Sequence, residues 1–253
     1  MSVREFSELI GTAPGRPEAL GVRTGDLVYG CGITGRDRRT DECAPGLLSQ
    51  AGDALSVVDS YLRDLGGSLD NVARVSFFLR DPRDIAKVNE VWTARFPRSD
   101  DRPTYKFMAG QLGEAEELRV DFFAVLGQER HCLYLPKVAH GNPIPMAVRM
   151  GRYLFSSRIL PFDPATGEPG RDGAQQARFA AANADAILQL AQMPWSAVSQ
   201  GRAFVADPDD DELVRAEWDR RPVAAGAPLH VTRYRAGALA VLLEILAVDR
   251  PGH

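Results

Sequence analysis

The sequence predicts an α+β protein built from two tandem ββαβαββ domains, each a mixed sheet with two helices on one face. Two observations predict this class. Gln50 and Gln176, Val72 and Val198, and Trp92 and Trp218 are each 126 positions apart. Within each half, stretches that alternate with period two, as strands do, are interleaved with stretches spaced by three and four, as helices are. One offset kept over so much sequence predicts a duplicated domain.

Composition describes an ordinary globular protein. The 253 residues, 45% hydrophobic and 25% charged with net charge −4, are enough for two domains of roughly 120 residues. The arginines are interspersed with acids instead of forming a basic stripe, so we expect no nucleic-acid partner. The chain shows no apolar leader and no apolar run of about 18 residues, so we expect a cytoplasmic protein without a membrane segment.

Cysteine and histidine usage predicts neither a disulfide framework nor a metal site. The cysteines Cys31, Cys43 and Cys132 are widely spaced, without a CxxC pair. The four histidines form no HxH or HExxH pattern. We therefore expect no metal and no organic cofactor.

The first domain is predicted over residues 1–127, with residues 1–18 as an irregular lead-in. Thr24-Gly25-Asp26 is a turn sequence that predicts a hairpin within residues 19–35. Apolar residues spaced by three and four predict the two helices, and alternating or apolar runs predict the later strands. The predicted elements after the hairpin are a helix at 47–65, a strand at 72–79, a helix at 84–96, and strands at 104–112 and 118–126.

The second domain repeats this order over residues 146–253, after a linker and lead-in at 128–145. Its predicted elements are strands at 146–150 and 153–160, a helix at 174–192, a strand at 198–206, a helix at 210–220, and strands at 229–234 and 239–248. The last hairpin is three residues shorter than in the first domain, because Glu244 follows Asp121 by 123 positions.

Both helices of such a unit lie on one face of the sheet, which leaves the other face to be covered. Alternation predicts that this face carries Arg119, Asp121 and Phe123 in the first domain. In the second it carries Leu242, Glu244 and Leu246. A face that mixes apolar and charged residues predicts a homo-oligomer with pockets at its seams.

Two segments stand out in the chain: SSRILPFDPATGEPG, followed by Gln175-Gln176, and RVSFFLRDPRDIAKVNEVWTARFP. Both resemble the RidA family, also called YjgF or L-PSP. The resemblance covers nearly the whole chain and implies a chorismate-mutase-like domain that trimerises into a barrel, with pockets at the clefts between neighbouring domains. It also implies hydrolysis of reactive enamines or imines to ketoacids with release of ammonia.

The sequence departs from the family at the positions that carry this chemistry. The family arginine, which follows a proline at the start of the fifth strand, falls on Tyr105, and the family glutamate falls on Arg119. In the second domain the same positions lie near Val231 and Leu242. Neither copy keeps the arginine and glutamate pair.

The reaction needs a cation for the substrate carboxylate and an acid, or an ordered water, to protonate and hydrate the imine. From residues near the family's positions we predict two groups of site residues. The catalytic candidates are Tyr105, Arg119, Asp121 and Glu244, and the substrate-binding candidates are Asn89, Arg158, His230 and Arg233.

Other readings stay open. The charged candidates also fit cross-strand ion pairs or solvated surface groups. A duplicated chain is similar to the chorismatases, which have two YjgF-like halves, although they are longer. Both pockets can also be non-catalytic, in a protein that binds small metabolites or serves as a scaffold.

Overall fold

The structure is a computed structural model that describes residues 4–5, 21–37, 40, 42–234, 237 and 239–249. It divides into two compact units, Met1–Arg130 and His131–His253. Most of the segment predicted as a linker, 128–145, therefore belongs to the second unit. The predicted lead-in lies outside the described residues, apart from Arg4–Glu5.

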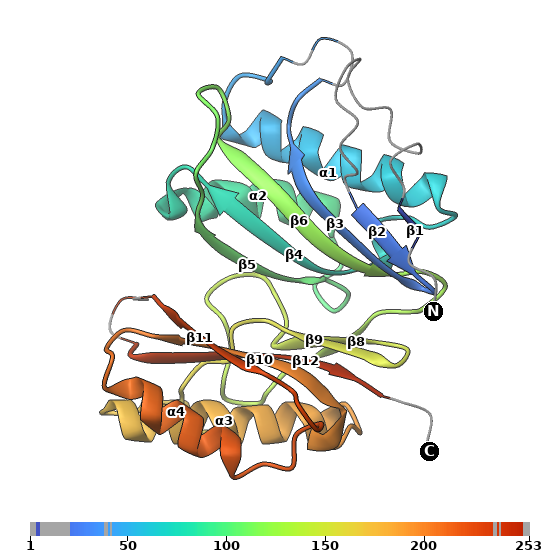
Figure 1. Ribbon diagram of the computed structural model, residues 1–253. Helices are drawn as coiled ribbons and strands as arrows, with labels where there is room; N and C mark the ends of the chain where they lie inside the picture. The colour runs from blue at the N-terminus through green and yellow to red at the C-terminus, as the bar shows by residue number, and fades with distance from the viewer. Residues whose placement is uncertain are drawn as a thin grey trace. The chain divides into compact units, whose positions relative to one another are not determined.

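In the first unit, Gly25 adopts a left-handed backbone with φ 62°, which closes the predicted hairpin between β2 and β3. The predicted ββαβαββ order is confirmed, with the short strand β1 added at its beginning. The elements are β1 (Arg4–Glu5), β2 (Gly21–Thr24), β3 (Leu27–Thr34), α1 (Leu47–Asp64), β4 (Val72–Leu79), α2 (Ile85–Arg95), β5 (Thr104–Ala109) and β6 (Leu118–Val125) (Figure 1).

The second unit repeats this order. Its first strand, β7, lies inside the segment predicted as irregular and pairs with β8. The elements are β7 (His131–Leu133), β8 (Ala147–Met150), β9 (Tyr153–Ser156), α3 (Gly173–Leu190), β10 (Val198–Val205), α4 (Asp210–Asp219), β11 (Leu229–Arg233) and β12 (Val241–Val248).

Both sheets have the same topology. The strand order is β1-β2-β3-β6-β4-β5 in the first unit and, read from its β7 edge, β7-β8-β9-β12-β10-β11 in the second. In each sheet one pair is parallel, β4 with β5 and β10 with β11. The register between strands therefore identifies counterparts for the paired positions of the central strands in the two units.

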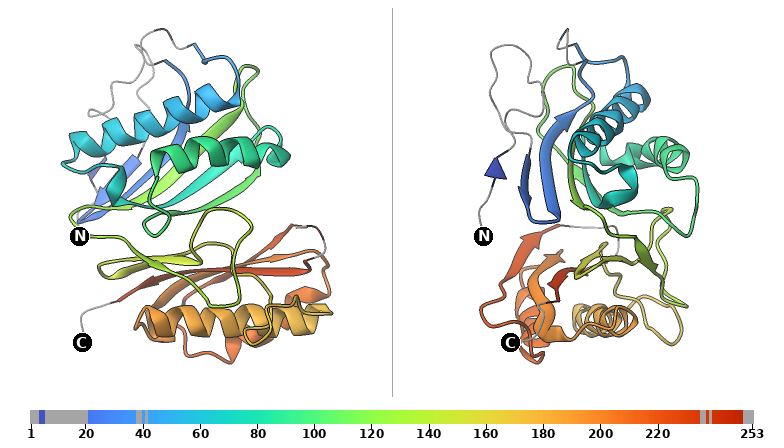
Figure 2. Two further views of the ribbon diagram at one scale, coloured as in Figure 1. Left: turned by 180° about the vertical axis from the view of Figure 1, so that it is seen from behind. Right: turned by 90° about the vertical axis from the view of Figure 1, so that its right-hand side faces the viewer.

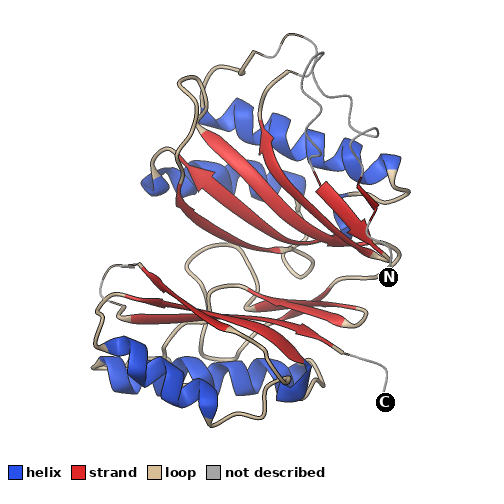
Figure 3. Cartoon of the chain, in the orientation of Figure 1, coloured by secondary structure: helices blue, strands red, loops and turns tan. Residues whose placement is uncertain are grey.

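Two helices cover one face of each sheet, as the sequence predicts (Figures 2 and 3). Trp92 on α2 and Trp218 on α4 are both buried, at equivalent places. The opposite face of each sheet, here called the helix-free face, carries the side chains that alternate with the core. In unit one these include Asp121, and in unit two Glu244, as predicted.

A buried glutamine near the start of the long helix fixes the final hairpin of each unit. Gln50 accepts a hydrogen bond from the Glu117 N–H at 2.8 Å and donates to Ala44 and Ala115 carbonyls, both at 2.9 Å. Gln176 accepts from the Ala240 N–H at 2.7 Å. The repeat thus conserves a polar contact inside the fold as well as its apolar core.

None of the helices in the described part of the chain combines the length and apolarity needed to cross a bilayer.

Candidate active site

One extra residue is inserted in the second unit where the chain continues beyond β9. Phe155 pairs with Leu246, and the next bridge joins Ile159 to Leu243. Four steps along one strand therefore match three along the other, which defines a β-bulge. Bulges of this kind often re-aim side chains next to active sites.

The bulge brings two consecutive side chains to the helix-free face. Leu154 and Ile159 both belong to the core, although strict alternation would put residues five apart on opposite faces. The extra residue resolves this conflict and leaves Ser157 and Arg158 on the same side of the sheet. This local geometry brings a hydroxyl and a guanidinium together on one face.

Arg158 is held among aromatic rings and a carboxylate. Its guanidinium carbon lies 4.8 Å from the Phe204 ring centroid and 4.4 Å from that of Tyr234. Its Nη1 donates to the Tyr234 hydroxyl at 3.2 Å, and its Nε lies 3.9 Å from Glu244 Oε1. Arg158 is 9% exposed and Glu244 4% exposed, so the two charges interact with little screening by solvent.

Three of the four site residues predicted in this unit lie in one row across the helix-free face. In the strand register, Glu244 is opposite Arg202, and Arg202 is opposite His230. Arg158 completes the row from the other side of Glu244. Residues 86 positions apart in the sequence, Arg158 and Glu244, are thus brought together by the fold.

Arg233, the fourth predicted residue, is not in this row. It points to the helix-facing side of β11, where its Nη2 donates to Asp211 Oδ2 on α4 at 3.2 Å. The alternation along β11 separates Arg233 from His230, so the structure does not bring this predicted substrate-binding residue together with Glu244. Arg233 ties a helix to the sheet.

His140, which the sequence did not single out, contacts the site from the loop between β7 and β8. Its Nε2 lies 2.6 Å from Ser157 Oγ. Burial, followed by the Arg158 cation, lowers the pKa of His140 to about 4, so the ring is neutral at neutral pH. No sequence pattern pointed to this contact, because it joins a loop residue to a bulge.

The first unit has a bulge at the equivalent place with different chemistry. Gly30 pairs with Phe122 and Ile33 with Val120, so one residue is again extra. Gly32, the counterpart of Arg158, has a left-handed φ of 72°, and its N–H donates to Asp121 Oδ1 at 2.9 Å. A backbone donor here takes the place of the guanidinium.

The remaining groups near Asp121 form a more dispersed arrangement. Burial, together with the nearby Asp121, raises the pKa of Tyr29 to about 12 and also raises the pKa of the Cys31 thiol. The guanidinium of Arg119 lies 4.7 Å from the Phe78 ring centroid. Of the predicted residues of this unit, Arg119 and Asp121 share the helix-free face.

Tyr105 and Asn89 lie on the opposite side of the same sheet. The Tyr105 hydroxyl donates to Asn89 Oδ1 on α2, and its ring centroid lies 5.1 Å from that of Trp92. Burial raises the pKa of Tyr105. The structure therefore does not bring Tyr105 together with Arg119 and Asp121, the other catalytic candidates predicted in this unit.

The strand register also changes which residue of the second unit corresponds to Tyr105. Val75 pairs with Tyr105, and Gly201, which is 126 positions after Val75, pairs with Leu229. The position predicted near Val231 is thus Leu229, two residues earlier. The counterpart of Arg119 is Leu242, as predicted.

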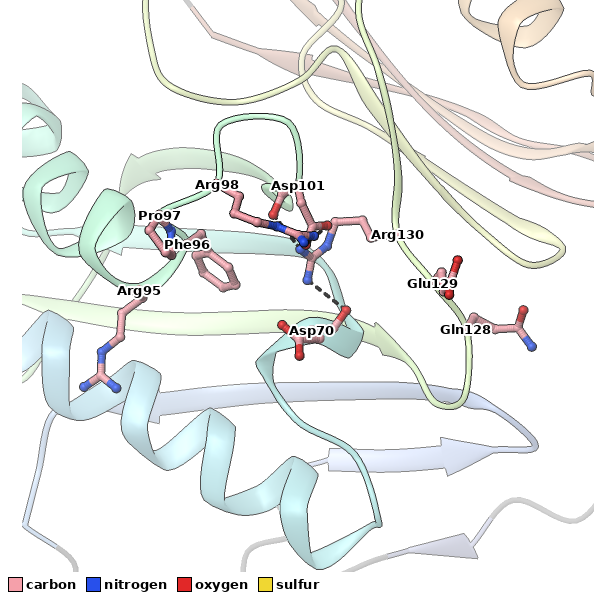
Figure 4. Close-up of a pocket in the computed structure, with 9 residues that line it drawn as sticks. All are labelled: Asp70, Arg95, Phe96, Pro97, Arg98, Asp101, Gln128, Glu129 and Arg130. Carbon is pink, nitrogen blue, oxygen red and sulfur yellow. Dashed lines mark hydrogen bonds and ion pairs between the residues drawn. The ribbon is translucent and has the colours of Figure 1, made fainter.

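The first unit also has a cavity of about 620 Å³ whose lining includes Arg95, Phe96, Arg98 and Arg130 (Figure 4). Arg130 has a structural role, because it joins several segments of the unit through hydrogen bonds. Its five N–H donors contact the carbonyls of Leu69, Asp70, Val72 and Asp101 and the Asp101 carboxylate, at 2.8 to 2.9 Å. Arg130 thus has no donor left for a ligand, and the cavity is a weaker candidate than the row on the second sheet.

In the described part of the chain, no group of three or more His, Cys, Asp and Glu side chains has an arrangement that could hold a metal ion.

A sequence model of the family described as endoribonuclease L-PSP matches residues 15–123. A RutC family protein of Haemophilus influenzae is 35% identical over 79 residues, which cover 31% of this chain and 61% of that protein. A RutC family protein of Pyrococcus horikoshii is 30% identical over 84 residues, which cover 33% of this chain and 67% of that protein. The chain belongs to the RidA/L-PSP family. It spans 61% of the length of the Haemophilus relative.

Solved RidA-family structures match about half of the chain. A crystal structure of RidA from the Antarctic bacterium Psychrobacter is 24% identical and covers 47% of this chain and 95% of its own, with a TM-score of 0.42. A structure from Thermotoga maritima, titled a putative endoribonuclease, is 26% identical and covers 49% and 98%, with a TM-score of 0.43. The chain itself contains two compact units with the same strand order.

Proposed function

We propose that this RidA-family chain hydrolyses an imine or enamine of a small carboxylated metabolite, and that the second unit carries the reaction. The observation that supports the proposal best is the pairing of Arg158 with Glu244 on the helix-free face. A cation and a carboxylic acid group are the two elements that this chemistry requires. Neither Arg158 nor Glu244 occupies the position that the family resemblance predicts for its arginine or its glutamate. The proposed site is therefore displaced within the same sheet.

Arg158 is assigned to the substrate carboxylate. A guanidinium presents a planar fork of N–H donors that matches a carboxylate in a bidentate way. The rings of Phe204 and Tyr234 flank the guanidinium and keep its orientation fixed. This leaves the direction of Arg158 set before the substrate arrives, which lowers the entropy cost of binding.

Glu244 is assigned to proton transfer. In the reaction, water adds to the carbon of the C=N bond, the nitrogen gains two protons in all, and ammonia leaves as the ketone forms. A carboxylate beside the imine can take a proton from the water and return it to the nitrogen. The net change is one imine and one water converted to one ketone and one ammonia.

We further propose a cytoplasmic homo-oligomer, with a trimer favoured. The helix-free face of the first sheet carries the half-buried aromatic side chains of Tyr29, Phe78 and Phe123 beside Arg119 and Asp121. Such a face is stabilised when another copy covers it. Sedimentation of the purified chain tests the state directly, and a monomer at micromolar concentration contradicts it.

The test of the activity is ammonia release from a freshly generated 2-aminoacrylate-type intermediate. Arg158→Gln is expected to lower kcat/KM roughly 100-fold, because a charge-assisted bidentate contact is lost. Arg158→Lys keeps the charge and loses the fork, so an intermediate loss is expected. The matched control is Arg220→Gln, an exposed arginine on the same unit that pairs with Glu217, for which less than a twofold change is expected.

No acceleration over buffer by the folded wild-type protein overturns the enzymatic proposal. The alternative is a non-catalytic binder of small carboxylates, and the burial of Arg158 and Glu244 against each other is compatible with it. Calorimetric titration with pyruvate separates the two. Binding that depends on Arg158 without turnover supports the binder.

A further inference from the structure

We propose that His140 is a positioning residue for Arg158, which it acts on by holding the bulge at Ser157. This inference rests on the proposed function only for its kinetic test. A bulge leaves one residue outside the ladder of strand hydrogen bonds, so its conformation depends on side-chain contacts. In the second unit those contacts converge on two serines and His140.

The first contact fixes Ser157 against β8. The Ser157 N–H donates to the Met146 carbonyl at 2.9 Å, and its hydroxyl donates to the same oxygen at 2.8 Å. A serine hydroxyl has a single proton, and a carbonyl can only accept. The Ser157 oxygen is therefore an acceptor toward His140.

The second contact follows from the first. Because Ser157 Oγ acts as an acceptor at 2.6 Å, His140 Nε2 must carry the proton. This assigns the neutral ring as the Nε2–H tautomer. The low pKa of His140 supports a neutral ring, because burial disfavours the imidazolium and the nearby Arg158 cation repels it.

The third contact fixes the other side of the bulge. Ser156 Oγ accepts a hydrogen bond from the Ile245 N–H at 2.8 Å, and Ile245 directly follows Glu244. Ser156 thus ties the bulge to the strand of the carboxylate, while Ser157 and His140 tie it to β8 and the loop before it. Arg158 directly follows these two anchored residues in the chain, so the direction of its side chain depends on both.

The bulge of the first unit presents no long side chain, so it offers a comparison with the bulge held by the two serines and His140. The first unit's bulge ends in Gly32, whose backbone N–H meets Asp121 directly. No long side chain has to be aimed there. A positioning residue is needed only where an arginine must be presented from the bulge.

The experiment compares His140→Leu with His140→Gln. Leucine fills similar space without a donor, whereas a glutamine amide can donate to Ser157 Oγ without titrating. The first readout is independent of activity: the rate at which phenylglyoxal modifies Arg158, followed by mass spectrometry of the folded protein. We expect a rise of about fivefold or more for His140→Leu, the equivalent of one lost hydrogen bond, and near wild-type rates for His140→Gln.

The second readout is kinetic. For His140→Leu we expect KM for the imine to rise about tenfold with kcat changed less than threefold, and for His140→Gln a return to near wild-type values. His131→Leu, an exposed histidine of the same unit, is the matched control. Thermal unfolding of each variant confirms that the second unit is folded.

Unchanged modification of Arg158 in His140→Leu overturns the proposal. So does a His140→Gln variant that loses kcat while its Arg158 stays protected, because that result assigns His140 to proton transfer. If the wild-type protein has no turnover but modification responds as expected, the positioning role stands and the proposed function fails.

Discussion

The helix-free faces of the two sheets have the same topology and the same bulge, but they present different groups there. In the second unit the bulge presents Arg158, which pairs with Glu244. In the first unit it presents a glycine N–H to Asp121. Core positions such as Trp92 and Trp218 and the buried glutamines kept their roles across the repeat. The comparison indicates that packing constrained the interior of both units, while the groups at the bulge were free to diverge.

The first prediction, which has the greatest magnitude, concerns the buried glutamine that both units contain. Gln50→Leu and Gln176→Leu each leave a backbone N–H and a backbone carbonyl, part-buried or buried, without their glutamine partner. We expect each to lower the free energy of unfolding of its own unit by about 4 kcal/mol. Urea unfolding followed by tryptophan fluorescence measures this, because Trp92 reports on the first unit and Trp195 and Trp218 on the second. A loss in one variant alone would show that the contact is not equivalent.

The second prediction concerns a residue specific to the second unit. The pKa of His140 is lowered from its ordinary value of 6.5 to about 4 by burial and by Arg158. Between these two pH values the unfolded chain binds more protons at His140 than the folded chain does. The free energy of unfolding is therefore unaffected by His140 above pH 6.5 and decreases as the pH falls from 6.5 to 4. The loss is up to about 3 kcal/mol.

The check is to measure the unfolding free energy of the wild type and of His140→Gln from pH 7 to pH 4. The wild type should lose more stability than the variant over this range. Parallel curves would contradict the buried, neutral state of the ring.

The third prediction contrasts the two carboxylates. Glu244→Gln removes the proposed proton carrier and is expected to reduce kcat for ammonia release about 100-fold. Asp121→Asn changes the equivalent position of the first unit, and a change below threefold is expected if only the second unit is active. Equal losses in both variants would show that both faces take part.

The smallest effect concerns Tyr105, which occupies the position where the family resemblance predicts an arginine. Tyr105→Phe removes one hydrogen bond to Asn89 and should cost about 1 kcal/mol of unfolding free energy. Turnover should change less than twofold, because the hydroxyl lies on the helix-facing side and its counterpart Leu229 has none. A tenfold loss of turnover would return Tyr105 to the list of catalytic residues.

The order of the secondary-structure elements could be predicted from the linear pattern of residues. The 126-residue offset predicted two equivalent units, and the spacing of apolar residues predicted strand Val72–Leu79 without error and the helices to within about two residues at each end. These features depend on local periodicity, which is visible in the spacing of apolar residues along the sequence. Alternation also placed Asp121 and Glu244 correctly on the helix-free face.

Which side chains contact one another depends on the three-dimensional fold. Strict alternation cannot show the bulge that turns both Ser157 and Arg158 to one face, because a bulge is defined by the register between two strands. The same holds for His140, whose contact with Ser157 depends on the path of a loop. Tyr105 shows the converse, since a residue that the family resemblance predicts to be in the site faces a tryptophan in the core. Chemistry in this protein depends on contacts between distant strands, which periodicity does not encode.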